Sequence, residues 1–178
     1  MATSSGGYLT HWERSGWTRD HVAYRIRPIR ENDAARERAF IMALSPDARY
    51  TRMMHAMREP AAALVEQLVD VDYARSMAFV ALVGDGAEER IIGIARYAGN
   101  EAGSCEFAVA VLDEWQGRGV AGTLSKYLLV YARRHGMRSL HATMFATNRA
   151  MIELAHGLGM TPHLSPQDPT LMTASRTL

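Results

Sequence analysis

The sequence lacks the marks of secreted and membrane-spanning proteins. It contains one cysteine, Cys105, among 178 residues, so an internal disulfide cannot form. No apolar run approaches the roughly 20 residues that a membrane-spanning helix needs, and the N-terminus has neither the basic stretch nor the apolar core of a secretory signal. We therefore expect the protein to work in the reducing cytoplasm.

An excess of charge of one sign is also lacking. The 20 basic and 19 acidic side chains leave a formal net charge of +1, which creates no field that would attract nucleic acid or an anionic membrane. Metal-binding spacing is missing as well, because none of the seven histidines has another histidine four residues away. The sequence thus predicts no metal, no nucleic-acid partner and no membrane partner, and it carries no signal for an oligomeric state.

What is present is the composition of an ordinary globular protein. Apolar residues make up 48% and charged residues 22% of the chain, and the length suits one domain. Residues 1–20 are predicted to form an N-terminal extension, and residues 21–178 a single domain. Tyr8, Trp12 and Trp17 indicate that the extension packs against the rest of the protein.

Hydrophobic periodicity and turn residues predict alternating strands and helices. Strands are expected at residues 22–29, 78–83, 91–97, 104–112, 140–145 and 171–176. Helices are expected at residues 31–44, after Ser45-Pro46, after Pro60, at residues 120–134 and after Asn148. The fold class is therefore α/β (α+β), with a mixed, mostly antiparallel sheet covered by helices on both faces.

The most informative segment is a glycine-rich turn between an apolar run and the amphipathic run 120–134. The N–H groups in the first turn of a helix have no partner within the helix and favour an anion. Gly117, Gly119 and Gly122 leave those amides accessible, so the turn is predicted to hold a pyrophosphate. It is not a P-loop, because Val120-Ala121 follows Gly119 in place of Lys-Ser/Thr. It also lacks the acidic residue that a dinucleotide fold places on the next strand.

Gln116, Gly119 and Ala121 match another pattern, Gln/Arg-x-x-Gly-x-Gly/Ala after an apolar strand. On these residues the chain resembles the GNAT superfamily of acetyl-CoA-dependent N-acetyltransferases. The segment 148–160 is similar to the family's Asn-started helix that closes in Leu-Gly-Phe, with Met160 in place of the aromatic residue. Three upstream segments resemble the acetyltransferase domain of Pat-type protein lysine acetyltransferases, and the similarity spans roughly residues 22 to 160. These segments are 26–34, 44–52 and 71–78.

The resemblance implies the GNAT fold, whose sheet is splayed at the strand that binds acyl-CoA, and it implies acetyl-CoA as co-substrate. The pantetheine arm is expected to pair with the main chain of that strand, and the diphosphate to lie on the turn. For two of the expected ligands an ordinary role stays open, because Arg118 can be solvated and Asn148 can cap its own helix. The residues expected to bind the cofactor are Val109, Val111, Gln116, Gly117, Arg118, Gly119, Val120, Ala121, Gly122 and Asn148.

The implied reaction needs a neutral amine to attack a thioester, so a base is expected beside the cofactor strand. Glu106 is the candidate, because it lies on that strand between small same-face alanines that leave a cleft open. Pat-type enzymes carry their proposed glutamate base on the equivalent strand. The alternative is an ion pair of Glu106 with Arg96 or Arg138, and Glu101, in a turn, is the second candidate for the base.

The predicted acceptor is a primary amine, preferably a protein lysine, in a partner such as an acyl-CoA synthetase. The alternatives are a small amine as acceptor and a catalytically silent acyl-CoA-binding sensor. The sensor alternative arises because many GNAT enzymes protonate the leaving thiolate with a Tyr where this chain has Ala155. Tyr127 and Tyr131 are expected in the core, so no residue is assigned as the acid. Cys105 has no histidine near it in sequence, which favours direct transfer over a covalent acyl-enzyme.

Overall fold

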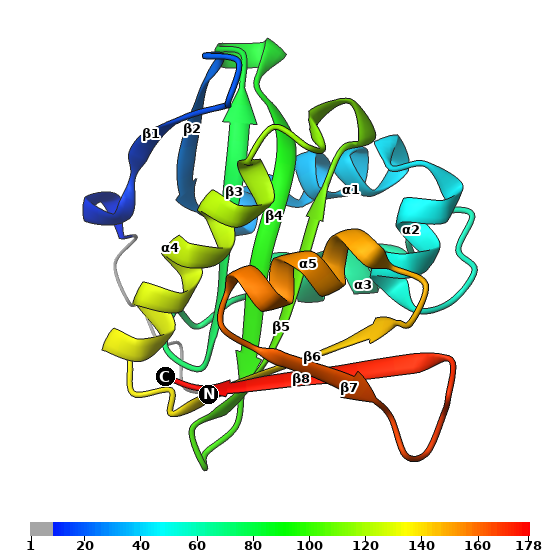
Figure 1. Ribbon diagram of the computed structural model, residues 1–178. Coiled ribbons are helices and arrows are strands. Elements are labelled where there is room, and N and C mark those ends of the chain that lie inside the picture. Colours follow the sequence, from blue (N-terminus) through cyan, green and yellow to red (C-terminus); the bar gives the residue numbers. More distant parts are fainter. Residues whose placement is uncertain (1–8) are drawn as a thin grey trace.

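A single eight-stranded sheet organises residues 9–178, the part of the chain that the computed structural model describes (Figure 1). The strands follow the order β1-β2-β3-β4-β5-β6-β8-β7. Neighbouring strands are antiparallel except β5 and β6, which are parallel, so the mixed, mostly antiparallel sheet is confirmed. The strands are β1 (Arg14–Trp17), β2 (Ala23–Pro28), β3 (Ser76–Val83), β4 (Arg90–Gly99), β5 (Ser104–Val111), β6 (Ser139–Phe145), β7 (Thr161–Leu164) and β8 (Leu171–Thr177).

Helices cover both faces of the sheet, as the sequence predicts (Figure 1). One face carries α4 (Val120–Arg134), which packs on β3, β4 and β5, and α5 (Arg149–Gly157), which contacts β7 and α4. The other face carries α1 (Ala34–Ala43), α2 (Pro46–Met53) and α3 (Ala62–Val69). The 3-10 helices are η1 (Thr10–Trp12), η2 (Glu31–Asp33), η3 (Gly86–Glu88) and η4 (Asp113–Trp115). No helix within residues 9–178 is long and apolar enough to cross a membrane.

The core surrounds the centre of the sheet, with α4 on one face and α1 and α3 on the other. Residues 77–82 of β3 are all buried, as expected for a continuous apolar run with layers on both faces. Tyr127 and Tyr131 of α4 are buried too, which confirms their prediction as core residues. Their hydroxyls donate to main-chain carbonyls, that of Tyr127 to Trp12 O at 2.9 Å and that of Tyr131 to Tyr73 O.

The N-terminal segment packs against this core. Trp12 is 6% exposed and contacts the rings of Phe79, Tyr127 and Tyr131. The following strand, β1, extends the sheet by pairing with β2. Trp17 points outward and is 64% exposed, whereas Tyr8 lies outside the described residues. The edge of the sheet is thus built by residues that precede the expected domain.

Local sequence signals locate most element boundaries correctly. The hydroxyl of Ser45 accepts a hydrogen bond from the Ala48 N–H at 3.2 Å, and Pro46 begins α2, as expected of this cap. Two strands escape prediction: β1 has four residues including a glycine, and β7 has four including a proline, and both residue types weaken a strand pattern. The insertion of β8 between β6 and β7 is likewise not encoded by any local pattern.

A buried charge network joins β2 to the first helices. Arg27, 2% exposed, donates to both carboxylate oxygens of the fully buried Asp33 at 2.6 and 2.8 Å. Glu89 lies 3.6 Å from Arg27 and is also paired with Arg36. Burial opposes ionisation of Asp33, but Arg27 and the Arg30 N–H outweigh it and hold the pKa of Asp33 below its ordinary value.

We expect Asp33→Asn to lower the free energy of unfolding by about 3 kcal/mol at neutral pH, because it leaves a buried guanidinium poorly paired. Since the pKa of Asp33 is depressed by folding, the stability that it contributes is present above about pH 4 and is lost as the pH falls through the lower folded-state value. Urea unfolding between pH 3 and pH 7 should show a steeper acid loss for the wild type than for the variant. The exposed pair Arg90–Glu114 provides the control, and Glu114→Gln should leave the free energy of unfolding nearly unchanged.

Candidate active site

The active-site candidate is built where β5 and β6 separate. Their parallel pairing covers Ser104 to Glu106 on β5 and Ser139 to His141 on β6. Beyond that point β5 continues to Val111 and β6 to Phe145 without pairing to each other. The sheet is therefore split, and β5 has an open edge over its second half.

The main-chain groups on this open edge can be identified from the pairing on the other side. Leu112 N–H donates to Ile92 O, and Asn100 N–H donates to Ser104 O. Because antiparallel neighbours alternate, the even residues of β5 bond to β4 and the odd residues turn their N–H and C=O toward the split. Val109 thus offers both groups there. Val111 offers its N–H, while its carbonyl accepts from Gln116 Nε2 at 3.1 Å.

The glycine turn after β5 exposes the positive end of α4. Gly117 and Gly119 have φ angles of 69° and 92°, which favour glycine. No side chain in the described part of the chain caps α4, and the first helical hydrogen bond comes from Thr123 N–H to Gly119 O. The N–H groups of the three residues between them, Val120, Ala121 and Gly122, have no acceptor within the helix. This end of α4 is suited to an anion.

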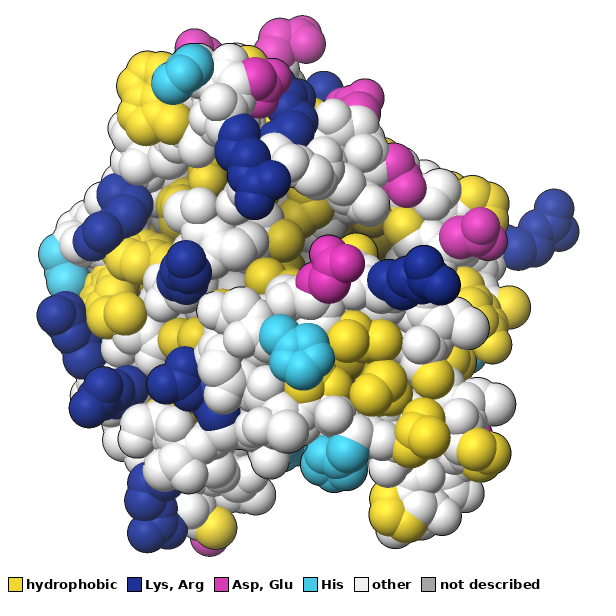
Figure 2. Space-filling model, viewed as in Figure 1, with side chains coloured by type: hydrophobic (Ala, Val, Ile, Leu, Met, Phe, Trp, Pro, Cys, Tyr) yellow, Lys and Arg dark blue, Asp and Glu magenta, His cyan; other side chains and the backbone are white. Residues whose placement is uncertain are grey.

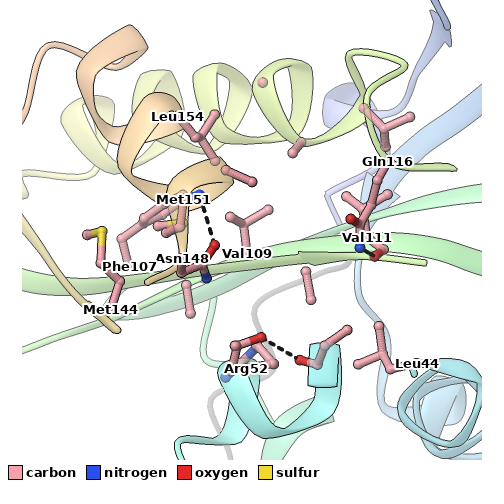
Figure 3. Close-up of a pocket in the computed structure, with 18 of the residues that line it drawn as sticks. Leu44, Arg52, Phe107, Val109, Val111, Gln116, Met144, Asn148, Met151 and Leu154 are labelled. Carbon is pink, nitrogen blue, oxygen red and sulfur yellow. Dashed lines mark hydrogen bonds between the residues drawn. The ribbon is translucent and has the colours of Figure 1, made fainter. Parts of the chain in front are cut away.

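A cavity of about 1300 Å³ joins the open edge to the glycine turn. In Figure 3, Val109, Met151 and Leu154 lie on one side of β5, and Leu44 and Arg52 on the other, so the cavity reaches both faces of the sheet through the split. Figure 2 shows the surface hollowed between α4 and α5, with apolar side chains inside the hollow. The cavity is lined by all but one of the residues predicted to bind the cofactor: Val109, Val111, Gln116, Gly117, Gly119, Val120, Ala121, Gly122 and Asn148.

Arg118 is the residue that does not line the cavity. Its Nε and Nη2 donate to the Asp20 carboxylate at 3.0 and 2.6 Å, and its guanidinium lies 4.4 Å from the centre of the Trp115 ring. The hydrogen bonds from Arg118 hold the pKa of Asp20 well below its ordinary value. The structure thus gives this arginine partners within the protein, and Arg19 lines the cavity in its place.

Glu106 lies at the last paired position before the split and lines the cavity with an exposed side chain. Side chains alternate along a strand, so Glu106, three residues before Val109 on β5, points to the opposite face, which carries α2 (Figure 3). Glu101, the second candidate for the base, is 92% exposed in a turn, 3.6 Å from Arg75, and does not line the cavity.

The two arginines that the sequence offers as partners of Glu106 are engaged elsewhere. Arg96 donates to Glu37 Oε1 at 2.7 Å, and Arg138 donates to Ala102 O at 2.6 Å. Glu106 takes part in none of the ion pairs found among residues 9–178. Its carboxylate is therefore open to the cavity.

Arg52 of α2 lines the same cavity as Glu106, and no pattern in the sequence predicts this neighbour. Arg52 lines the cavity, and burial together with the Arg96 charge lowers the pKa of Arg52 to about 10, against the opposing effects of Glu37 and Glu106. It therefore remains charged at neutral pH. Burial also raises the pKa of Glu37, which is 2% exposed and has one carboxylate oxygen without a hydrogen-bond partner. Arg52, Arg96 and Glu37 thus form a partly buried group of charges on the same face of the sheet as Glu106.

Asn148 has the capping role that the sequence leaves open. Its side-chain oxygen accepts from Met151 N–H at 3.1 Å at the start of α5 (Figure 3). The side chain also lines the cavity, so its NH₂ group can serve a ligand while the oxygen caps the helix. Ala155, at the position of the family's Tyr, is fully buried.

Other nucleophiles and metal sites find no support in the described residues. Cys105 is buried, and burial raises the pKa of its thiol to about 11, which suppresses the reactive thiolate. Residues 9–178 contain no group of three or more His, Cys, Asp or Glu side chains arranged to hold a metal ion.

Comparison with known proteins agrees with this architecture. Residues 24–161 match the model of the acetyltransferase (GNAT) domain. The chain belongs to the GNAT acetyltransferase family. It is 45% identical over 161 residues to Acetyltransferase PA5475 of Pseudomonas aeruginosa, covering 90% of this chain and 86% of that protein.

Two further relatives connect the chain with Pat acetyltransferases. Acetyltransferase Pat of Mycolicibacterium smegmatis is 33% identical over 136 residues, which are 75% of this chain and 40% of that protein. The crystal structure of the GNAT domain of S. lividans PAT superposes with a TM-score of 0.88 at 26% identity, covering 97% of this chain and 100% of that domain. Both the GNAT fold and the resemblance to Pat acetyltransferases are thereby confirmed.

A side chain placed in the glycine turn tests whether this turn binds coenzyme A. A Cβ added at Gly122 meets no atom within 4 Å, so Gly122→Val places a side chain in front of the free amides of α4. We expect the Kd for coenzyme A, measured by calorimetry, to rise about tenfold or more. Gly122→Ala, the smaller control, should weaken binding less and stabilise the helix by about 0.5 kcal/mol. Unchanged affinity in the valine variant would show that the ligand does not use this turn.

Proposed function

We propose that this GNAT acetyltransferase transfers an acetyl group from acetyl-CoA directly to a primary amine, with a protein lysine as the preferred acceptor and Glu106 as the base. The observation that carries the proposal is the position of Glu106 at the fork of β5 and β6, free of ion pairs within residues 9–178 and open to the cavity. GNAT acetyltransferases use acetyl-CoA, which supplies an activated thioester carbonyl when bound.

The chain offers matching groups along the length of such a ligand. The open edge of β5 presents main-chain donors and acceptors at Val109 to an amide-containing arm. The exposed amides of α4 suit a diphosphate, and the turn brings no bulky side chain between them and the cavity. In this placement the acyl group lies near the point where β5 and β6 separate, which is where Glu106 is located.

The base has a defined energetic task. A lysine amine with a pKa of about 10.4 is neutral in only about one molecule in a thousand at pH 7.4, which adds roughly 4 kcal/mol to the barrier. Glu106 accepts the proton, directly or through a water molecule, as the nitrogen bonds to the acetyl carbon and the carbon–sulfur bond breaks. The departing thiolate takes a proton from water, because the side chain of Ala155 carries no acid and lies in the core.

The acceptor side of the cavity supports a large and adaptable acceptor. It is formed by α2 and the segment that follows it, including Met53, Met54 and His55. Methionine side chains are flexible and suit variable contacts such as those of a peptide. The carboxylates of Asp47 and Glu106 on this side attract an ammonium group, and the charge of Arg52 opposes part of that attraction.

Replacement of the base separates chemistry from binding. Glu106→Gln should lower kcat by at least about 100-fold while the Kd for coenzyme A stays within about twofold. The residual rate should rise with pH as more of the acceptor amine becomes neutral. Glu153→Gln is the matched control, because Glu153 lines the same cavity from α5. Equal activity of Glu106→Gln and the wild type, measured as free thiol released, would remove Glu106 from the mechanism.

The acceptor class can be decided with a panel of amines. A lysine-bearing protein such as an acyl-CoA synthetase should be acetylated faster than a polyamine or an amino sugar, as measured by thiol release and mass spectrometry. The same protein with its lysine amines dimethylated is the control and should not react, because a tertiary amine cannot form a stable amide. Turnover with small amines alone would establish the small-amine alternative. Binding of acetyl-CoA without turnover on any acceptor would establish a sensor.

A further inference from the structure

The loop between β1 and β2 docks on the glycine turn. Arg19 N–H donates to Arg118 O at 3.0 Å, and Arg19 Nη1 donates to Gly117 O at 3.3 Å. Gly119 is the N-cap residue of α4. A Cβ added to Gly119 would lie within 4 Å of the Arg19 side chain. Residues that precede the matched GNAT segment 24–161 therefore contact the proposed phosphate site.

The two arginines of this contact have different surroundings. Arg118 is held by both oxygens of Asp20 and by the Trp115 ring, outside the cavity. Arg19 lines the cavity and uses one of its guanidinium donors on a single long hydrogen bond, which leaves the others available. It lies beside the uncapped positive end of α4. None of the ion pairs found among residues 9–178 involves Arg19, whereas the nearby Asp20 carboxylate is taken up by Arg118.

We propose that Arg19 binds a phosphate of coenzyme A, and that the Asp20–Arg118 pair fixes the turn so that Arg19 faces the ligand. This inference rests on the proposed placement of coenzyme A in the cavity. A guanidinium and a phosphate form charge-assisted, often bidentate hydrogen bonds, and the free amides of α4 complete the coordination. The diphosphate and the ribose 3′-phosphate share this chemistry.

Calorimetry with coenzyme A and 3′-dephospho-coenzyme A tests the inference without turnover. Arg19→Ala should raise the Kd for coenzyme A about tenfold, and the loss should shrink at high salt. Arg19→Lys should recover part of the affinity, because it restores the charge without the fork. An equal loss with both ligands assigns Arg19 to the diphosphate, whereas a loss confined to coenzyme A assigns it to the 3′-phosphate. Arg14→Ala is the matched control, since Arg14 lies on β1 and does not line the cavity.

Several outcomes would overturn the role of Arg19. Wild-type affinity in Arg19→Ala, or an equal loss in Arg14→Ala, would show that no specific phosphate contact exists. An equal, salt-independent loss in Asp20→Asn and Arg19→Ala would reduce the loop to a structural support. Failure of the wild-type protein to bind coenzyme A would instead refute the proposed function itself, so the two failures are distinguishable.

Discussion

The divergence of β5 and β6 is the constraint on which the rest of the site depends. A sheet normally satisfies the main-chain groups of its interior strands, and leaving them unpaired is costly when they are buried. Here the groups of Val109 and the N–H of Val111 face a cavity of about 1300 Å³. The fold tolerates the fork because both strands are held firmly on their other sides, β5 by β4 and β6 by β8 along its whole length.

The fork also separates two kinds of chemistry. On the α4 face, the turn is anchored by local contacts: Gln116 to the end of β5, and Arg118 to Asp20. On the opposite face, charged side chains from α1, α2 and β4 gather beneath Glu106, with Glu37 bonded to Arg96 and Arg52 nearby. Ser45 connects the two, because its N–H and hydroxyl both donate to Asp113 at the start of the turn. Hydrogen bonds thus connect the start of α2, the helix that carries Arg52, to the segment that leads into the glycine turn.

Much of this could be predicted from the sequence, and the exceptions share a cause. Strand and helix positions follow from periodicity and from caps such as Ser45. Anion binding at the glycine turn could be predicted because the glycines concerned lie within a few residues of one another. The partners of Arg118 and the approach of Arg52 to Glu106 depend on segments that are far apart in the chain. The β1 strand is short and interrupted by Gly16, so its contribution to the sheet emerges only from its pairing with β2. The role proposed for Arg19 could not be predicted for the same reason, because Arg19 and the glycine turn are far apart in the chain.

The position of β8 between β6 and β7 has a consequence for synthesis on the ribosome. Both neighbours precede β8 in the chain, and neither pairs with the other, so they emerge with bare backbone edges that await a later segment. Such edges invite association between nascent chains. Until β8 has been made, the edges of β6 and β7 that it covers stay unpaired.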